Sequence, residues 1–68
     1  MSDLSVLVGQ LVRRSRVRKK ISQEKLALLC DTDRSYLGRI ERGEVNITLE
    51  KLYDIATALE MDPKQLLP

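Results

Sequence analysis

The sequence predicts an all-α fold of five short helices around one aliphatic core, in a single domain over residues 1–68. Apolar residues recur at spacings of three and four, which is the period of a helix with one buried face. Ser, Thr and Asp, which favour helix starts, stand directly before these apolar runs. No stretch alternates between apolar and polar residues as a half-buried strand would.

The composition restricts both the core and the chemistry. With 68 residues and no Phe or Trp, the core must be small and aliphatic. A chain of this length buries only about 60% of its unfolded surface and often gains stability from oligomerisation. One Cys and no His leave no internal disulfide, ordinary zinc site or Ser–His or Cys–His pair. We therefore expect no catalytic residue, metal or cofactor, and interpret Cys30 as a small core residue.

Targeting signals are not evident. No stretch approaches the roughly 18 apolar residues of a membrane span. The N-terminus lacks the basic-then-apolar layout of a secretion signal. We expect a cytoplasmic protein that has no membrane partner, a location that also suits a reduced thiol.

Charge is divided unevenly along the chain. Residues 1–43 contain ten Lys and Arg against five Asp and Glu, which gives +5. Residues 44–68 contain two against five, which gives −3, and the sum is the net +2. This polarity suits a polyanion bound on one side and a different contact on the other.

The first helix is expected over about residues 5–19. Its inward stripe consists of Leu4, Leu7, Val8, Leu11, Val12 and Ser15. We interpret the basic run over residues 13–20 as the end of this helix, where positive charge complements the helix dipole. A free basic arm is the alternative.

Residues 22–43 are expected to form two short helices joined by a tight turn. Ser22 can cap the first helix through its hydroxyl group. Asp31 can adopt the left-handed backbone of the turn, and Asp33 can cap the second helix. Gly43 then ends that helix, because a residue with positive φ is wanted there.

The second of these helices has a polar outward face. Leu37 and Ile40 set its inward face, and at 100° per residue the other side presents mostly basic and small residues. These residues are Arg34, Ser35, Gly38, Arg39 and Arg42. Such a helix, braced by another across a tight turn, fits the DNA major groove, where arginines reach guanine edges or phosphates. A helical hairpin with a solvated basic face is the alternative that spacing alone leaves open.

Two further helices are expected after Gly43. Thr48 caps the first, whose apolar face is Leu49, Leu52, Ile55, Ala56 and Leu59. The second opens on Asp62 and Pro63, with Gln65 placed almost as in a capping box.

The chain resembles the Cro/lambda-repressor-like family of helix-turn-helix proteins, also called the XRE family. The matching residues are Ser22-Gln23-Glu24-x-Leu26-Ala27, Asp33-Arg34-Ser35-Tyr36-Leu37 and Ile40-Glu41-Arg42-Gly43, and the likeness continues to Asp62-Pro63-x-x-Leu66-Leu67. The string D-R-S-Y-L…I-E-R-G looks most like the small controller proteins of restriction–modification systems. Lys20 and Asp31 depart from the pattern, because the family usually has Gly at both places.

The resemblance implies a sequence-specific regulator of transcription that binds double-stranded DNA as a homodimer on a palindromic operator. RNA polymerase is a further candidate partner, and no small-molecule ligand is evident. Our candidate base contacts are Arg34, Ser35, Tyr36 and Arg39, and our candidate phosphate contacts are Ser22, Gln23, Arg42 and Asn46. The resemblance also implies an ion pair between Arg16 and Glu41.

The acidic C-terminal part offers apolar residues that a small core cannot obviously absorb. We interpret Val45, Ile47, Met61, Leu66 and Leu67 as the dimer interface. Alternatively, Leu66 and Leu67 close the core of the monomer.

Rival functions belong to other classes of protein. An antitoxin-like or bridging module would mainly bind a protein, and a partner gene beside it would identify that function. Single-stranded RNA binding is disfavoured, because two tyrosines are the only aromatic residues available for stacking. An enzyme is disfavoured further, because the sequence has no Gly-rich phosphate loop, metal cluster or nucleophile–base pair.

Overall fold

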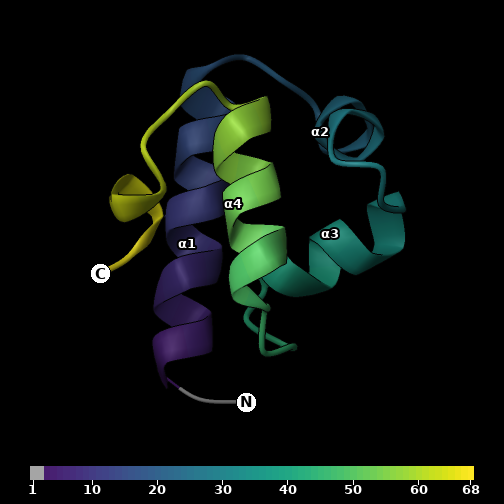
Figure 1. Ribbon diagram of the computed structural model, residues 1–68. Coiled ribbons are helices and arrows are strands. Elements are labelled where there is room, and N and C mark those ends of the chain that lie inside the picture. The colour runs from purple at the N-terminus through teal and green to yellow at the C-terminus, as the bar shows by residue number, and fades with distance from the viewer. Residues whose placement is uncertain (1–2) are drawn as a thin grey trace.

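The computed structural model describes residues 3–68, and over that range it contains four α-helices and one 3-10 helix (Figure 1). In chain order they are α1 (Asp3–Arg18), α2 (Gln23–Leu29), α3 (Arg34–Glu41), α4 (Leu49–Ala58) and η1 (Pro63–Leu66). The all-helical prediction is confirmed. None of the helices described is long and apolar enough to cross a membrane.

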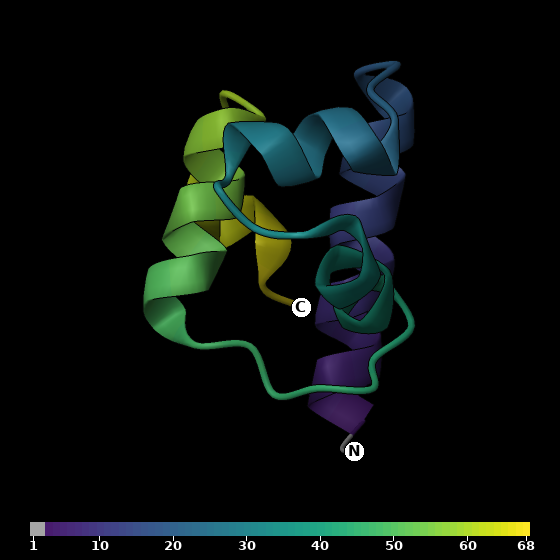
Figure 2. The same ribbon diagram turned by 90° about the vertical axis from the view of Figure 1, so that its right-hand side faces the viewer.

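Side chains from all five elements meet in one aliphatic core. α3 packs against α1 and α2, α2 contacts α4, and η1 contacts both α4 and α1. In Figure 2, α2 lies across one end of the molecule and α3 is seen end-on beside α1. The largest fully buried side chains are Val12, Leu26, Leu37, Ile40, Leu52, Ile55, Leu59 and Leu66. Cys30 also lies in this core, where burial raises the pKa of its thiol and keeps it protonated.

Side chains just before the helices cap α2, α3 and α4. The Ser22 hydroxyl accepts a hydrogen bond from the Lys25 N–H at 3.0 Å. Asp33 accepts from the Tyr36 N–H at 2.7 Å, and Thr48 accepts from the Lys51 N–H at 3.1 Å. Each bond satisfies a backbone donor that the first helical turn leaves unpaired. The predicted caps are therefore confirmed at all three positions.

Each of the four α-helices is followed, two positions after its last residue, by a residue with left-handed backbone. These residues are Lys20, Asp31, Gly43 and Glu60, with φ between 55° and 75°. At each end the next residue's N–H donates to a carbonyl five positions back, as in the bond from Thr32 to Ala27 at 2.9 Å. This is the Schellman arrangement, which pairs carbonyls that the last helical turn leaves open. Lys20, Asp31 and Glu60 adopt it without being glycine, at some steric cost.

α1 and α3 approach each other closely at Gly9. A Cβ atom on Gly9 would lie 2.3 Å from the Ile40 carbonyl oxygen and 2.8 Å from the Glu41 carbonyl oxygen. These are backbone atoms of α3, so they cannot rotate out of the way. Glycine at this position lets α1 support the C-terminal half of α3 directly.

The C-terminal element differs from the prediction in two ways. It is a 3-10 helix of four residues rather than a fifth α-helix, although Asp62 and Gln65 form a capping box. Leu66 is 0% exposed and belongs to the core of the monomer. Its assignment to a dimer interface is therefore wrong, because η1 packs against α1 and α4 and its last side chain is enclosed there.

Candidate nucleic-acid interface

The outward face of α3 is the most basic surface of the helix-turn-helix segment. Leu37 and Ile40 are buried, so the opposite side of α3 points to solvent. Arg34, Ser35 and Arg39 are exposed on α3, and Arg42 is exposed at its C-terminal cap. The structure thus brings together the three candidate base contacts of this face and one candidate phosphate contact. Tyr36 is only half exposed, because its ring packs partly against the core.

A shallow hollow of about 380 Å³ lies on this face. Its lining consists of Gln23, Arg34, Ser35, Gly38, Arg39 and Arg42. Gly38 is buried beneath its neighbours, since a Cβ atom there would lie 3.1 Å from Arg42 Nη1 and 3.8 Å from Gln23 Oε1. The helical wheel placed Gly38 outward correctly but could not show that two long side chains fold over it.

One buried carboxylate connects three helices beneath this face. Glu41 accepts from Arg16 Nε at 2.7 Å and from Arg16 Nη2 at 3.1 Å, and its side chain is only 2% exposed. It also accepts from Gln23 Nε2 at 2.9 Å. Arg16 Nη1 donates to the Ile21 carbonyl at 2.9 Å, which fixes the segment before α2. The ion pair implied by the resemblance is present, and it joins α1, the start of α2 and the end of α3.

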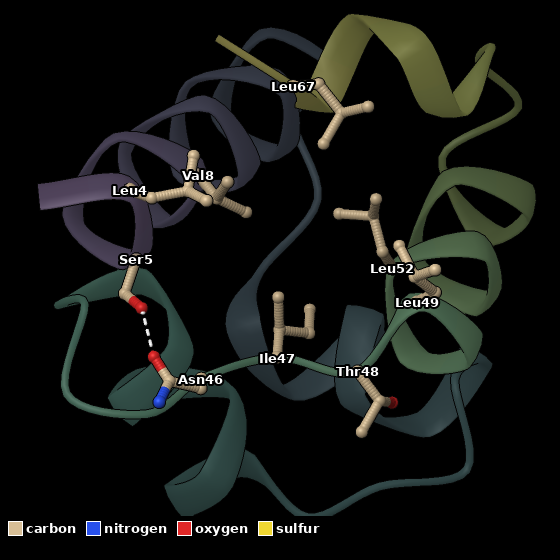
Figure 3. Close-up of a pocket in the computed structure, with 9 residues that line it drawn as sticks. All are labelled: Leu4, Ser5, Val8, Asn46, Ile47, Thr48, Leu49, Leu52 and Leu67. Carbon is tan, nitrogen blue, oxygen red and sulfur yellow. Dashed lines mark hydrogen bonds between the residues drawn. The ribbon is translucent and has the colours of Figure 1, made fainter. Parts of the chain in front are cut away.

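The other candidate phosphate contacts occupy different settings. Ser22 is exposed at the N-terminus of α2, beside Gln23. Asn46 lies in the loop between α3 and α4, where its Oδ1 accepts from the Ser5 hydroxyl at 2.7 Å. In Figure 3 the amide nitrogen of Asn46 lies on the side away from that bond. The Ser22 hydroxyl and the Asn46 amide nitrogen are therefore both compatible with donation to a phosphate.

Glu44 is a charged neighbour of the interface that the sequence reading missed. Arg42 Nε donates to Glu44 Oε2 at 2.5 Å, and Arg39 Nε lies 3.9 Å from Glu44 Oε1. The hydrogen bond lowers the pKa of the Glu44 carboxyl, and it raises the pKa of the Arg42 guanidinium. Glu44 is therefore ionised at neutral pH and faces two arginines of the candidate surface. The Gly-Glu pair after α3 was the available signal, because a left-handed glycine turns the next residue back towards the helix.

These features define a class of protein. A short helix with an exposed basic face, held across a tight turn by a preceding helix, is a helix-turn-helix DNA-binding unit. The helix-turn-helix family model matches residues 12–66. The chain belongs to this family, as its XRE-like motifs suggested, and it is a DNA-binding regulator of transcription.

Comparison with individual proteins shows which members of this family the chain resembles. The chain is 45% identical over 67 residues to the control protein C.BamHI of Bacillus amyloliquefaciens, covering 97% of this chain and 83% of that protein. It is similar to the crystal structure of the restriction–modification controller protein C.AhdI from Aeromonas hydrophila, with TM-score 0.90, 44% identity and coverage of 93% and 91%. It also resembles the structure of a hypothetical transcription factor from Neisseria, with TM-score 0.91, 39% identity and coverage of 97% and 76%. The resemblance to controller proteins is thus confirmed.

Proposed function

We propose that this regulator acts in the cytoplasm as a homodimer on a palindromic operator, and that it controls a restriction–modification operon. The operon is proposed from the relatives, two of which are named as control or controller proteins. The observation that carries the DNA-reading part is the exposed face of Arg34, Ser35 and Arg39 on α3. One such helix reads only a few base pairs, so two copies are needed for useful specificity.

Selection of bound fragments from random duplex DNA tests this function. The expected result is enrichment of a two-fold symmetric sequence whose half-sites lie about 34 Å apart, or about one helical turn. Failure to enrich any sequence would contradict the proposal. It would favour the alternative of an antitoxin-like or bridging module that mainly binds protein.

Base-reading and phosphate-holding residues should be separable by mutation. Arg39→Ala is expected to cost about 1–3 kcal/mol on the selected sequence and to relax the preference at one position. Arg42→Ala should weaken binding to the selected sequence and its single-base variants about equally and reduce the salt slope by about one. Fluorescence anisotropy titrations over a range of salt concentrations measure both effects.

Arg14→Ala is the control for these titrations. Arg14 is an exposed arginine of α1, on the face that the helical period turns away from the inward stripe. Its loss should affect binding less than that of either arginine. An unchanged sequence preference in Arg39→Ala would show that the base contacts are wrongly assigned.

An apolar groove supports the homodimer. It has a volume of about 310 Å³ and lies between the start of α1, the loop before α4 and the residue after η1 (Figure 3). Leu4, Ile47, Leu49 and Leu67 are among its lining residues. Of the interface residues expected from the sequence, Ile47 and Leu67 line the groove, whereas Val45 and Met61 do not. Ile47 packs partly against the core, as Val45 and Met61 do. We therefore propose Leu4 and Leu49 as additional interface residues.

Leu49→Glu should convert the dimer to a monomer. Leu49 is 73% exposed and is the first residue of α4, where a carboxylate is compatible with the helix dipole. In a two-fold symmetric interface the patch of one protomer faces the same patch of its partner, so one substitution introduces two charges. Sedimentation at micromolar concentration should show the loss of dimer, with circular dichroism to confirm folding.

Leu28→Glu provides the matched control. Leu28 is 74% exposed, but it lies on α2 and does not line the groove. This variant should remain dimeric. If wild type sedimented as a monomer and still bound a palindromic site without cooperativity, the dimer proposal would fail.

A further inference from the structure

Glu44 is held beside the arginines of α3 by both its side chain and its backbone. Its carboxylate accepts from Arg42 and lies within 3.9 Å of Arg39. Its N–H donates to the Arg39 carbonyl at 2.9 Å, and the Gly43 N–H donates to the Ile40 carbonyl at 3.0 Å. These two bonds complete the Schellman end of α3. The position of Glu44 relative to the basic face is therefore fixed by the helix terminus.

Gly43 permits this placement for two reasons. Its φ of +75° is a conformation that other residues rarely adopt. A Cβ atom there would also lie 2.6 Å from the Cα of Val6 on α1. The turn that returns Glu44 to α3 is thus packed against α1, so the backbone of Glu44 cannot easily drift away from Arg42.

We propose that Glu44 limits the affinity for the operator, because its carboxylate pairs with Arg42 in the free protein and has to be displaced by a closely placed DNA phosphate. The inference rests on the proposed role of Arg42 as a phosphate contact. A carboxylate and a phosphate oxygen accept the same charge-assisted hydrogen bonds from a guanidinium group. Binding of DNA to Arg42 is then an exchange of one acceptor for another.

This exchange takes place on the operator and not on random DNA. On the operator, base contacts hold α3 in register, and a phosphate comes close enough to replace the carboxylate. On random DNA the backbone is not held at that position, so Glu44 keeps Arg42 neutralised. The operator complex must therefore break the ion pair between Arg42 and Glu44, whereas the random complex leaves it intact. The ion pair thus lowers the affinity for the operator more than the affinity for random DNA.

Glu44→Gln tests the inference, because it removes the charge and keeps the size of the side chain. Binding to the selected operator should tighten by about two- to fivefold, which is the range expected for an exposed ion pair. The salt slope on random DNA should steepen by about 0.9, the value for one additional phosphate contact. Affinity for random duplex DNA should rise less, so the ratio of specific to non-specific affinity should rise.

Two further variants test the mechanism. Glu60→Gln makes the same change in net charge on an exposed residue that follows α4, and it should leave the affinity ratio unchanged. In an Arg42→Ala background, Glu44→Gln should lose most of its effect, because no guanidinium remains to be released.

The possible results separate the inference from the function on which it rests. Three results would each overturn the role of Glu44. They are equal tightening of binding to both DNAs, an effect no larger than that of Glu60→Gln, and an effect that persists without Arg42. Wild-type protein that binds duplex DNA without any sequence preference would instead refute the proposed function.

Discussion

Replacement of Glu41 by alanine is expected to lower the free energy of unfolding by about 3–5 kcal/mol. The substitution leaves the Arg16 guanidinium, whose side chain is 12% exposed, without its carboxylate, and it removes an acceptor from Gln23. A domain of this size has a total stability of about 3–10 kcal/mol, so the loss is a large fraction of it. Thermal unfolding should show a fall in Tm of about 4–8 °C for each kcal/mol.

Two variants make this measurement specific to the ion pair. Glu24→Ala removes an exposed carboxylate from the first turn of α2 and should cost far less. Arg16→Met combined with Glu41→Ala should cost less than the sum of the two single substitutions, because no buried charge is left unpaired. Additive costs would argue against direct pairing of Arg16 with Glu41.

Gly9→Ala is expected to destabilise the protein by about 3 kcal/mol, the upper end of the usual range for overpacking. Alanine within a helix normally gains about 0.5–1 kcal/mol over glycine, but here its methyl group would overlap the carbonyl oxygens of Ile40 and Glu41. α1 would have to move away from α3, and the core between them would open. Urea unfolding monitored by circular dichroism measures the change.

Gly38→Ala is a matched control, because Gly38 is also a buried helical glycine. The nearest atom to its added Cβ is Arg42 Nη1, at the end of a flexible side chain that can move. This variant should be close to neutral or slightly stabilising. If the two variants lost similar stability, the close approach of α1 and α3 would not be the cause of the Gly9 effect.

Local chemistry made much of the fold predictable from the sequence. Ser22, Asp33 and Thr48 are caps because a short polar side chain can reach a backbone N–H three residues later. Most of the inward faces followed from helical periodicity, which needs no knowledge of distant contacts. Leu4, Leu7 and Leu49 were expected on those faces as well but are exposed, because they lie at helix starts that no other element covers. The 3-10 geometry of η1 and the burial of Leu66 were harder to predict from the sequence, because both depend on how the last residues pack against α1 and α4.

The candidate interface was predictable in its outline but not in its connections. The outward arginines follow from the helical period, and the Arg16–Glu41 pair was implied only by the family resemblance. The bond from Gln23 to Glu41 depends on how α2 meets α3, which spacing along the chain does not determine. The contact of Glu44 with Arg42 depends on the left-handed turn at Gly43, so a helical wheel that stops at the end of α3 omits it.

The capping of the helices also affects how quickly the chain can fold. The caps at Ser22, Asp33 and Thr48, and the Schellman ends after them, use partners at most five residues apart. Helix boundaries can therefore form before distant segments meet, and little loop-closure entropy is spent in advance of favourable contacts. Helical domains dominated by such near-neighbour contacts fold in microseconds to milliseconds. We therefore expect a single protomer to fold within about milliseconds.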